Sequence, residues 1–272
     1  MFNLMLITND IDLAKHAVDA GVSRIFVDLE VNGKFERQGH LDTLISKHSM
    51  QDARNIRNVI ADNELLIRLN PLYDGSALEV EQAISAGADL LMLPMFNSAD
   101  EVNTFCRLIA GRAKCIPLVE TAAAASCLAE VVKVEGVSEI YIGLNDLHLD
   151  LKLNFMFEPL ANGLLESLIT IVKQACLPFG FGGLARIGEG DLPAELILAE
   201  HVRLGSSCVI LSRAFHRKSE SLIALKSVMN LETEVKKILD TRTQLLQRNA
   251  TEQLADKTKV VDIINRIVMS KA

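Results

Sequence analysis

Two carboxylates stand where two apolar segments of the chain end. Glu120 directly follows the apolar run 115–119, and Asp146 comes shortly after the apolar run 140–142. Short apolar runs of this kind predict buried strands, and barrel enzymes keep their chemistry just beyond the carboxyl ends of their strands. Either carboxylate alone could instead cap a helix. Together they favour a site for a hard divalent cation, Mg2+ or Mn2+, which prefers oxygen ligands.

A third charged residue, Arg68, interrupts the apolar run 65–69. A guanidinium does not lose its proton, so burying it without an anion is very costly. One interpretation is a structural ion pair with a neighbouring carboxylate. The other is a catalytic arginine that faces the substrate beside the metal.

The elements that must position these residues follow a repeated pattern. A junction of helix end, glycine and apolar strand occurs around Gly21, Gly87, Gly136 and Gly205, which indicates a repeated βα unit. Eight predicted strands alternate with helices and imply a parallel sheet; they are centred near residues 6, 26, 67, 92, 117, 141, 180 and 209. We therefore predict a (β/α)8 TIM barrel over residues 1–216. A doubly wound open sheet is the alternative, disfavoured because no G-x-G-x-x-G follows the first strand.

Residues 217–272 are surplus to the barrel and predict helices. The first, over about 219–247, would close the barrel. The second, over 251–269, carries an apolar face of Leu254, Val261, Ile264 and Val268. With no barrel surface evident for it to cover, we predict a homo-oligomer held partly by this helix; the alternative is that it folds back on its own chain.

The composition excludes several classes of protein. The chain has 272 residues, of which 49% are hydrophobic and 23% charged, with a net charge of −7. The sequence has no basic cluster of the kind that binds nucleic acid. No apolar run reaches the about 20 residues that a membrane span needs. The five cysteines are scattered, without a C-x-x-C, and no signal-peptide layout is present. These features predict free thiols and a cytoplasmic location.

The motifs at the strand ends resemble those of the HpcH/HpaI aldolase and citrate lyase β-subunit family, one of the phosphoenolpyruvate/pyruvate-binding barrels. The resemblance covers roughly residues 4–215. It rests on the order and spacing of five segments: DLE at 28–30, IRLNP at 67–71, GADLLMLP at 87–94, PLVET at 117–121 and IGLNDL at 142–147.

The resemblance implies roles for particular residues. The two metal ligands of the family correspond to Glu120 and Asp146, and its arginine to Arg68. The acid of the D-L-E motif corresponds to Glu30, and Gly143 and Asn145 are expected to contact the substrate, a small ketoacid or hydroxy acid. The implied activity is that of a class II-type aldolase, a metal-dependent lyase that breaks or forms a carbon–carbon bond through a metal-stabilised enolate.

The general base remains open between Glu30, His40, His48 and a water, of which Glu30 or the water is preferred. No lysine is predicted at the strand ends near this site, which disfavours a Schiff base, although Lys34 is a weak exception. Three other functions stay open: a citrate-lyase-like lyase of acyl (CoA) esters, a phosphosugar barrel that uses 182–183 and 212–213, and a catalytically silent scaffold.

Overall fold

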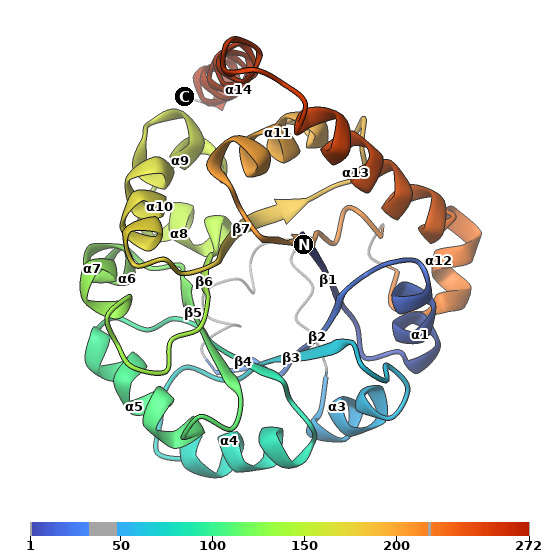
Figure 1. Ribbon diagram of the computed structural model, residues 1–272, viewed down its shortest axis with the longest axis vertical. Coiled ribbons are helices and arrows are strands. Elements are labelled where there is room, and N and C mark those ends of the chain that lie inside the picture. Colours follow the sequence, from blue (N-terminus) through green and yellow to red (C-terminus); the bar gives the residue numbers. More distant parts are fainter. Residues whose placement is uncertain (1, 33–47, 217–218, 272) are drawn as a thin grey trace.

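The protein is a closed barrel of parallel strands, each joined to the next by helices on the outside (Figure 1). The computed structural model describes residues 2–32, 48–216 and 219–271. Neighbouring strands pair in chain order, and β8 closes on β1. The strands are β1 Asn3–Ile7, β2 Arg24–Asp28, β3 Glu64–Arg68, β4 Leu90–Leu93, β5 Lys114–Val119, β6 Ile140–Ile142, β7 Phe179–Leu184 and β8 Cys208–Leu211. The predicted TIM barrel is confirmed.

The outer layer consists of helices that follow the strands. Its helices up to β8 are α1 Ile11–Asp19, α3 Met50–Arg57, α4 Ser76–Ser85, α5 Ala99–Ile109, α6 Ala122–Ser126, α7 Leu128–Val131, α8 Leu144–Asp150, α9 Glu158–Ala161, α10 Leu164–Gln174 and α11 Ala194–Leu204. The glycines of the four predicted junctions all have positive φ, from +75° at Gly205 to +100° at Gly21. Glycine adopts this backbone at no steric cost, so the chain can leave each helix and enter the next strand.

The strands carry two separate cores. Their outward side chains pack against the helices, and their inward side chains fill the barrel with Met5, Phe26, Leu66, Leu90, Met92, Ile116, Leu118, Tyr141 and Cys208. Arg24 closes the amino end of the barrel: it donates to Glu64 at 2.5 Å and to Glu139 at 2.8 Å. Because the interior is filled and its amino end is closed by ion pairs, chemistry is confined to the opposite rim.

The register of the strands brings the residues with potential chemistry to one rim. Asp28 and Arg68 are paired positions at the carboxyl ends of β2 and β3. Val119 and Ile142 are paired at the ends of β5 and β6, so Glu120 and Gly143 follow at the same level. The parallel register therefore sets the carboxylates and the arginine around one opening.

The C-terminal segment differs from the prediction. The expected helix over about 219–247 is two helices, α12 Leu222–Val228 and α13 Leu231–Leu245. Met229 between them is extended, and the side chain of Asn230 caps α13 by accepting from Thr233 N at 2.9 Å. A local side-chain cap of this kind competes with helix continuation, which explains the break.

The last helix, α14 Ala250–Lys271, packs against α11 and α9 of its own chain (Figure 1). Val260 and Ile264 are its fully buried apolar residues, whereas Leu254 is 62% exposed. The barrel does offer this helix a surface, and the buried stripe is rotated from the predicted one. None of the helices in the described part of the chain combines the length and apolarity needed to cross a membrane.

Candidate active site at the carboxyl rim of the barrel

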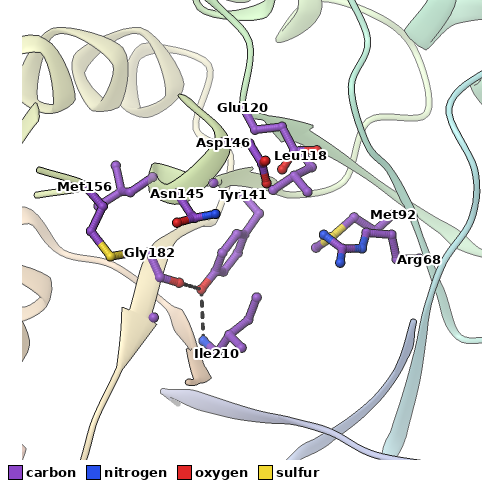
Figure 2. A pocket seen from close by; sticks show the side chains of 13 residues that line it. Arg68, Met92, Leu118, Glu120, Tyr141, Asn145, Asp146, Met156, Gly182 and Ile210 are labelled. Carbon is purple, nitrogen blue, oxygen red and sulfur yellow. Dashed lines mark hydrogen bonds between the residues drawn. The ribbon is translucent and has the colours of Figure 1, made fainter. Parts of the chain in front are cut away.

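A cavity of about 180 Å3 opens at the carboxyl ends of the strands (Figure 2). Its apolar side chains are Met92, Leu118, Tyr141, Leu144, Met156 and Ile210. Arg68, Glu120, Gly143, Asn145 and Asp146, all expected from the sequence to belong to the site, also line this cavity. The remaining one, Glu30, lies behind Arg68, with its Oε2 3.4 Å from Arg68 Nε.

Glu120 follows β5 and is 3% exposed. One of its carboxylate oxygens accepts from the backbone N–H of Met95 at 3.1 Å. Met95 has a φ of +52°, an uncommon value for a residue with a side chain. Local strain of this kind is tolerated where the surrounding structure fixes it, and here it accompanies the hydrogen bond to Glu120.

The electrostatics around Glu120 favour a bound cation. Burial raises the pKa of Glu120 well above its usual value; Arg68 opposes this rise, while Asp146 and Glu30 add to it. Three carboxylates close enough to influence one another therefore lie near the guanidinium of Arg68. A second positive charge between Glu120 and Asp146 would relieve their repulsion.

Asp146 approaches Glu120 from the first turn of α8. In Figure 2 its side chain lies beside that of Glu120, and the guanidinium of Arg68 points inward from the right of the view. The backbone between the two acidic elements is close-packed: a Cβ on Gly143 would come within 3.0 Å of the Glu120 side chain. Glycine at this position lets β6 approach Glu120.

Two carboxylates, rather than a larger cluster, are what the described part of this rim offers a metal. Within the described ranges, no three His, Cys, Asp or Glu side chains are grouped so as to hold a metal ion. Mg2+ and Mn2+ commonly take one or two carboxylates and complete their shell with water or substrate oxygens. Glu120 and Asp146 would suit such an ion, and the cavity beside them leaves room for water or substrate oxygens.

Arg68 is held by a bidentate ion pair with Asp28. Its Nε and Nη2 donate to the two Asp28 carboxylate oxygens at 2.9 and 2.8 Å. Burial alone would lower the pKa of Arg68, but the charges of Asp28 and Glu30 outweigh it and keep that pKa above its usual value. Nη1 makes no hydrogen bond to any described residue, so this edge of the fork is available to a ligand.

Of the two histidines considered as bases, only His48 lies within the described residues. His48 Nδ1 accepts from the backbone N–H of Asp28 at 3.0 Å, which ties it to the end of β2. His40 and Lys34 lie outside the described residues. Glu30 is 2% exposed and adjoins Arg68, so it is the candidate base that contacts a residue lining the cavity.

Tyr141 is a lining residue that the sequence analysis treated only as part of a strand. Its hydroxyl donates to the carbonyl of Gly182 at 2.7 Å and accepts from Ile210 N at 2.9 Å (Figure 2). These bonds bridge β7 and β8 where their register shifts. Gly180 makes room for the ring, because a Cβ there would lie 2.5 Å from it. An aromatic residue with a polar tip in an aliphatic strand was the available clue.

The glycines of the alternative phosphate site, Gly182 and Gly183, line the same cavity. Arg213 follows β8 on this rim and makes no hydrogen bond or ion pair with a described residue. Burial lowers the pKa of Arg213; Asp28 opposes this shift and Arg68 adds to it. Arg213 is thus within electrostatic range of the Arg68 and Asp28 pair, and the phosphosugar alternative involves the same site rather than a second one.

Comparisons with known proteins agree with the barrel fold. The family model described as "HpcH/HpaI aldolase/citrate lyase" matches residues 6–158. No curated protein sequence matches the chain. An HpcH/HpaI aldolase from Desulfitobacterium hafniense DCB-2 has a TM-score of 0.64 at 13% identity, covering 92% of this chain and 94% of its own.

Two further solved structures share the fold. A family protein from Burkholderia cenocepacia J2315 has a TM-score of 0.62 at 15% identity, over 88% of this chain and 94% of its own. RipC from Yersinia pestis has a TM-score of 0.59 at 16% identity, over 93% and 98%. These identities support the fold alone, while the family model spans more than half of the chain. The chain belongs to the HpcH/HpaI aldolase/citrate lyase family.

Proposed function

We propose that this protein is a divalent-metal-dependent carbon–carbon lyase that cleaves or forms a small 2-ketoacid or hydroxy acid. Its family supports a lyase-type barrel enzyme. The observation that carries the finer proposal is that Arg68, Glu120 and Asp146 line one cavity at the carboxyl rim. That cavity combines an acidic pair for a cation with a guanidinium edge for an anionic oxygen.

Glu120 and Asp146 would hold the cation, Mg2+ or Mn2+. When bound, it would supply positive charge beside the keto oxygen, where negative charge develops as the carbon–carbon bond breaks. Met95 N orients the Glu120 carboxylate, and the close approach of Gly143 limits how far it can turn. The ligand geometry is therefore set by the protein before any ligand enters.

Arg68 would bind the substrate through its unused Nη1 edge. Asp28 occupies the other edge of the fork and fixes the plane of the guanidinium. A fixed donor aimed at developing negative charge stabilises a transition state without reorganisation. Asn145, which also lines the cavity, offers an amide to the same ligand.

Glu30 would move the proton of the substrate hydroxyl, directly or through a water. It is buried beside Arg68 and close to the cavity without lining it. A base that adjoins a lining residue without lining the cavity itself suits transfer through one water. His48, bound through Nδ1 to the Asp28 backbone, supports the end of β2 in this arrangement.

A lyase of acyl esters of the citrate lyase type is the second candidate. The observation in its favour is that the D-L-E motif places both of its acids against Arg68. The two candidates differ in the substrate that they accept. Free hydroxy ketoacids and the corresponding coenzyme A thioesters should therefore be assayed side by side.

The test combines a substrate panel with metal binding. Cleavage of 4-hydroxy-2-ketoacids can be followed by separating the released 2-ketoacid from the substrate by liquid chromatography, and Mn2+ binding by the loss of the paramagnetic resonance signal of free Mn2+. Glu120→Gln and Asp146→Asn should each lower activity about 100-fold or more, as removal of a group that stabilises developing charge does. Both should also weaken Mn2+ binding while the melting temperature stays near the wild-type value.

Glu135→Gln, which changes an exposed carboxylate before β6, is the control and should alter neither property. Mn2+ binding that persists in both site variants would rule out a metal site at Glu120 and Asp146. Mn2+ binding by the wild-type protein without turnover of any ketoacid or thioester would rule out the lyase activity. Activity that depends on a phosphate group in the substrate would favour the phosphosugar alternative.

We also propose a homo-oligomer held partly by the C-terminal helices. Its support is the outer side of α14, where Leu254 and Met269 are 62% and 79% exposed. The packing of α14 on α9 and α11 leaves these residues in water. Exposed apolar side chains along one helix can serve as contacts for a second copy.

A further inference from the structure

We propose that Asn70 is a positioning residue, which holds Glu30 in place through the backbone that follows it. The inference rests on the proposed function, in which Glu30 moves a proton. Asn70 comes two residues after Arg68, directly beyond β3, and is buried. It is absent from the cavity lining, so its effect on the chemistry must pass through another residue.

The side-chain oxygen of Asn70 binds the two peptide groups that follow Glu30. Its Oδ1 accepts from Val31 N and from Asn32 N, each at 2.9 Å. A single acceptor shared by two successive N–H groups fixes both peptide planes at once. The chain leaving β2 is therefore anchored to the end of β3 immediately after Glu30.

Glu79 on α4 fixes the orientation of the Asn70 amide. Its Oε1 accepts from Asn70 Nδ2 at 2.5 Å, and its Oε2 accepts from Asn70 N at 3.3 Å. Burial raises the pKa of Glu79, and the two hydrogen bonds from Asn70 oppose that rise. An ionised carboxylate only accepts, so the NH2 group of Asn70 must face Glu79 and its oxygen must face Val31 and Asn32.

Glu30 is thereby held on both sides. On the near side, its own N–H donates to Asp28 Oδ1 at 3.3 Å. On the far side, Asn70 holds the next two peptides. The carboxylate itself lies 3.4 Å from Arg68 Nε. Glu79, Asn70 and the two peptide groups after Glu30 thus form a continuous chain of hydrogen bonds from an outer helix to the rim.

The other end of β3 supplies a matched control. Asn63 precedes the strand and bridges the turn before β2, donating through Nδ2 to Val22 O at 3.2 Å and Ser23 O at 3.3 Å. Like Asn70, it ties the β2 backbone to β3 through a side-chain amide. It does so at the amino end of the barrel, away from the cavity.

The test is a double-mutant cycle in the full-length protein, with the metal present. Asn70→Ala should lower kcat by about 10- to 100-fold, the usual loss when a partner behind a catalytic group is removed, with little change in KM. In a Glu30→Gln background it should cause almost no further loss, because residues that act as a unit are not additive. Asn63→Ala should lower the melting temperature and leave kcat unchanged.

A polarity swap guards against simple misfolding. Asn70→Asp alone keeps the acceptor for Val31 and Asn32 but places a second carboxylate against that of Glu79, and should lose activity. Combining it with Glu79→Gln gives the introduced carboxylate a donor on α4 and should restore most of kcat. An equal loss from Asn70→Ala in the wild-type and Glu30→Gln backgrounds would overturn the proposal.

Hydrogen exchange separates failure of this inference from failure of the proposed function. If the wild-type protein cleaves none of the substrates, the proposed function fails on its own assay. The role of Asn70 in holding the backbone after Glu30 is then tested by amide exchange at Val31 and Asn32. Asn70→Ala should accelerate this exchange at least 10-fold. Unchanged exchange at both amides would overturn it regardless of activity.

Discussion

The side chains of Arg68 and Asp28 face each other across paired positions of β3 and β2, joined by two hydrogen bonds of 2.9 and 2.8 Å. This pairing satisfies both interpretations that the sequence left open. Arg68 is a member of a buried ion pair, and it also lines the cavity. Its structural partner and its proposed ligand use different edges of one guanidinium.

We expect Arg68→Lys to lower kcat about 100-fold, because an ammonium cannot hold Asp28 and a ligand in fixed geometry together. The melting temperature should also fall, since Asp28 is fully buried. Arg112→Lys is the control: Arg112 forms a bidentate pair with Glu81 at the surface, at 2.8 and 2.5 Å, and its substitution should matter little. If Arg68→Lys is fully active but melts at a lower temperature, Arg68 has only a structural role.

Gly143→Ala should weaken Mn2+ binding about 10-fold or more without unfolding the protein. The added methyl would lie 3.0 Å from Glu120 Cβ and Oε2, so the carboxylate must move. The backbone of Gly143, with φ −83°, accepts alanine without strain. Gly111→Ala reverses these conditions, with φ +71° and open space; it should lower the melting temperature and leave Mn2+ binding intact. Wild-type affinity in Gly143→Ala would show that Glu120 is not a ligand.

His201 should make the fold sensitive to mild acid. Burial, with a smaller contribution from Arg242, lowers the pKa of His201 to about 3. The unfolded chain binds the proton near pH 6.5 and the folded chain does not, so stability is complete above that pH and falls as the pH decreases towards 3. At pH 5 the loss is roughly 2 kcal/mol.

Melting curves between pH 7 and pH 5 test this expectation. His201→Gln removes the titrating ring, although it also disturbs the stacking on Phe181 and the bond to Ser206. The variant should be less stable at pH 7 but should lose less on acidification. His16→Gln, at a less buried histidine, should retain the wild-type slope. An unchanged slope in His201→Gln would assign the acid sensitivity to other groups.

Two substitutions on α14 distinguish its packing on its own chain from a role in holding the oligomer. Ile264 is fully buried against the barrel helices, so Ile264→Asp should lower the melting temperature by burying an unpaired charge. Leu254→Asp, at an exposed position, should leave the melting temperature alone and reduce the mass per particle in light scattering. If Leu254→Asp and a truncation after Gln247 both keep the oligomer of the intact protein, another surface holds it.

The strands, and the polar residues at their carboxyl ends, could be predicted because local rules and tertiary structure agree there. The apolar runs before Glu120 and Asp146 were short and followed by polar residues, and this length and these flanking residues favour buried parallel strands. The glycine junctions repeated this pattern around the barrel. Asp28, the partner of Arg68, was within a quoted motif, but pairing it with Arg68 required the register of β2 and β3.

The C-terminal segment was predicted less well because helical periodicity does not show where a helix is capped or what it covers. Asn230 ended one predicted helix early through a side-chain cap. On α14, Leu254 and Val260 belong to equally regular apolar patterns, and only the surface of α11 and α9 selects the second. Asn70 escaped notice for a similar reason, since its partners are main-chain amides.

The ion pairs of Arg24 at the amino end of the barrel have a kinetic consequence. Because that end is closed and the interior is filled, a ligand can enter the described barrel only through the opening at its carboxyl rim. For a lyase, both fragments of a cleaved substrate must then leave by the way the intact molecule came in, one behind the other. The fragment nearer the rim would then leave before the one beside Arg68 and Glu120.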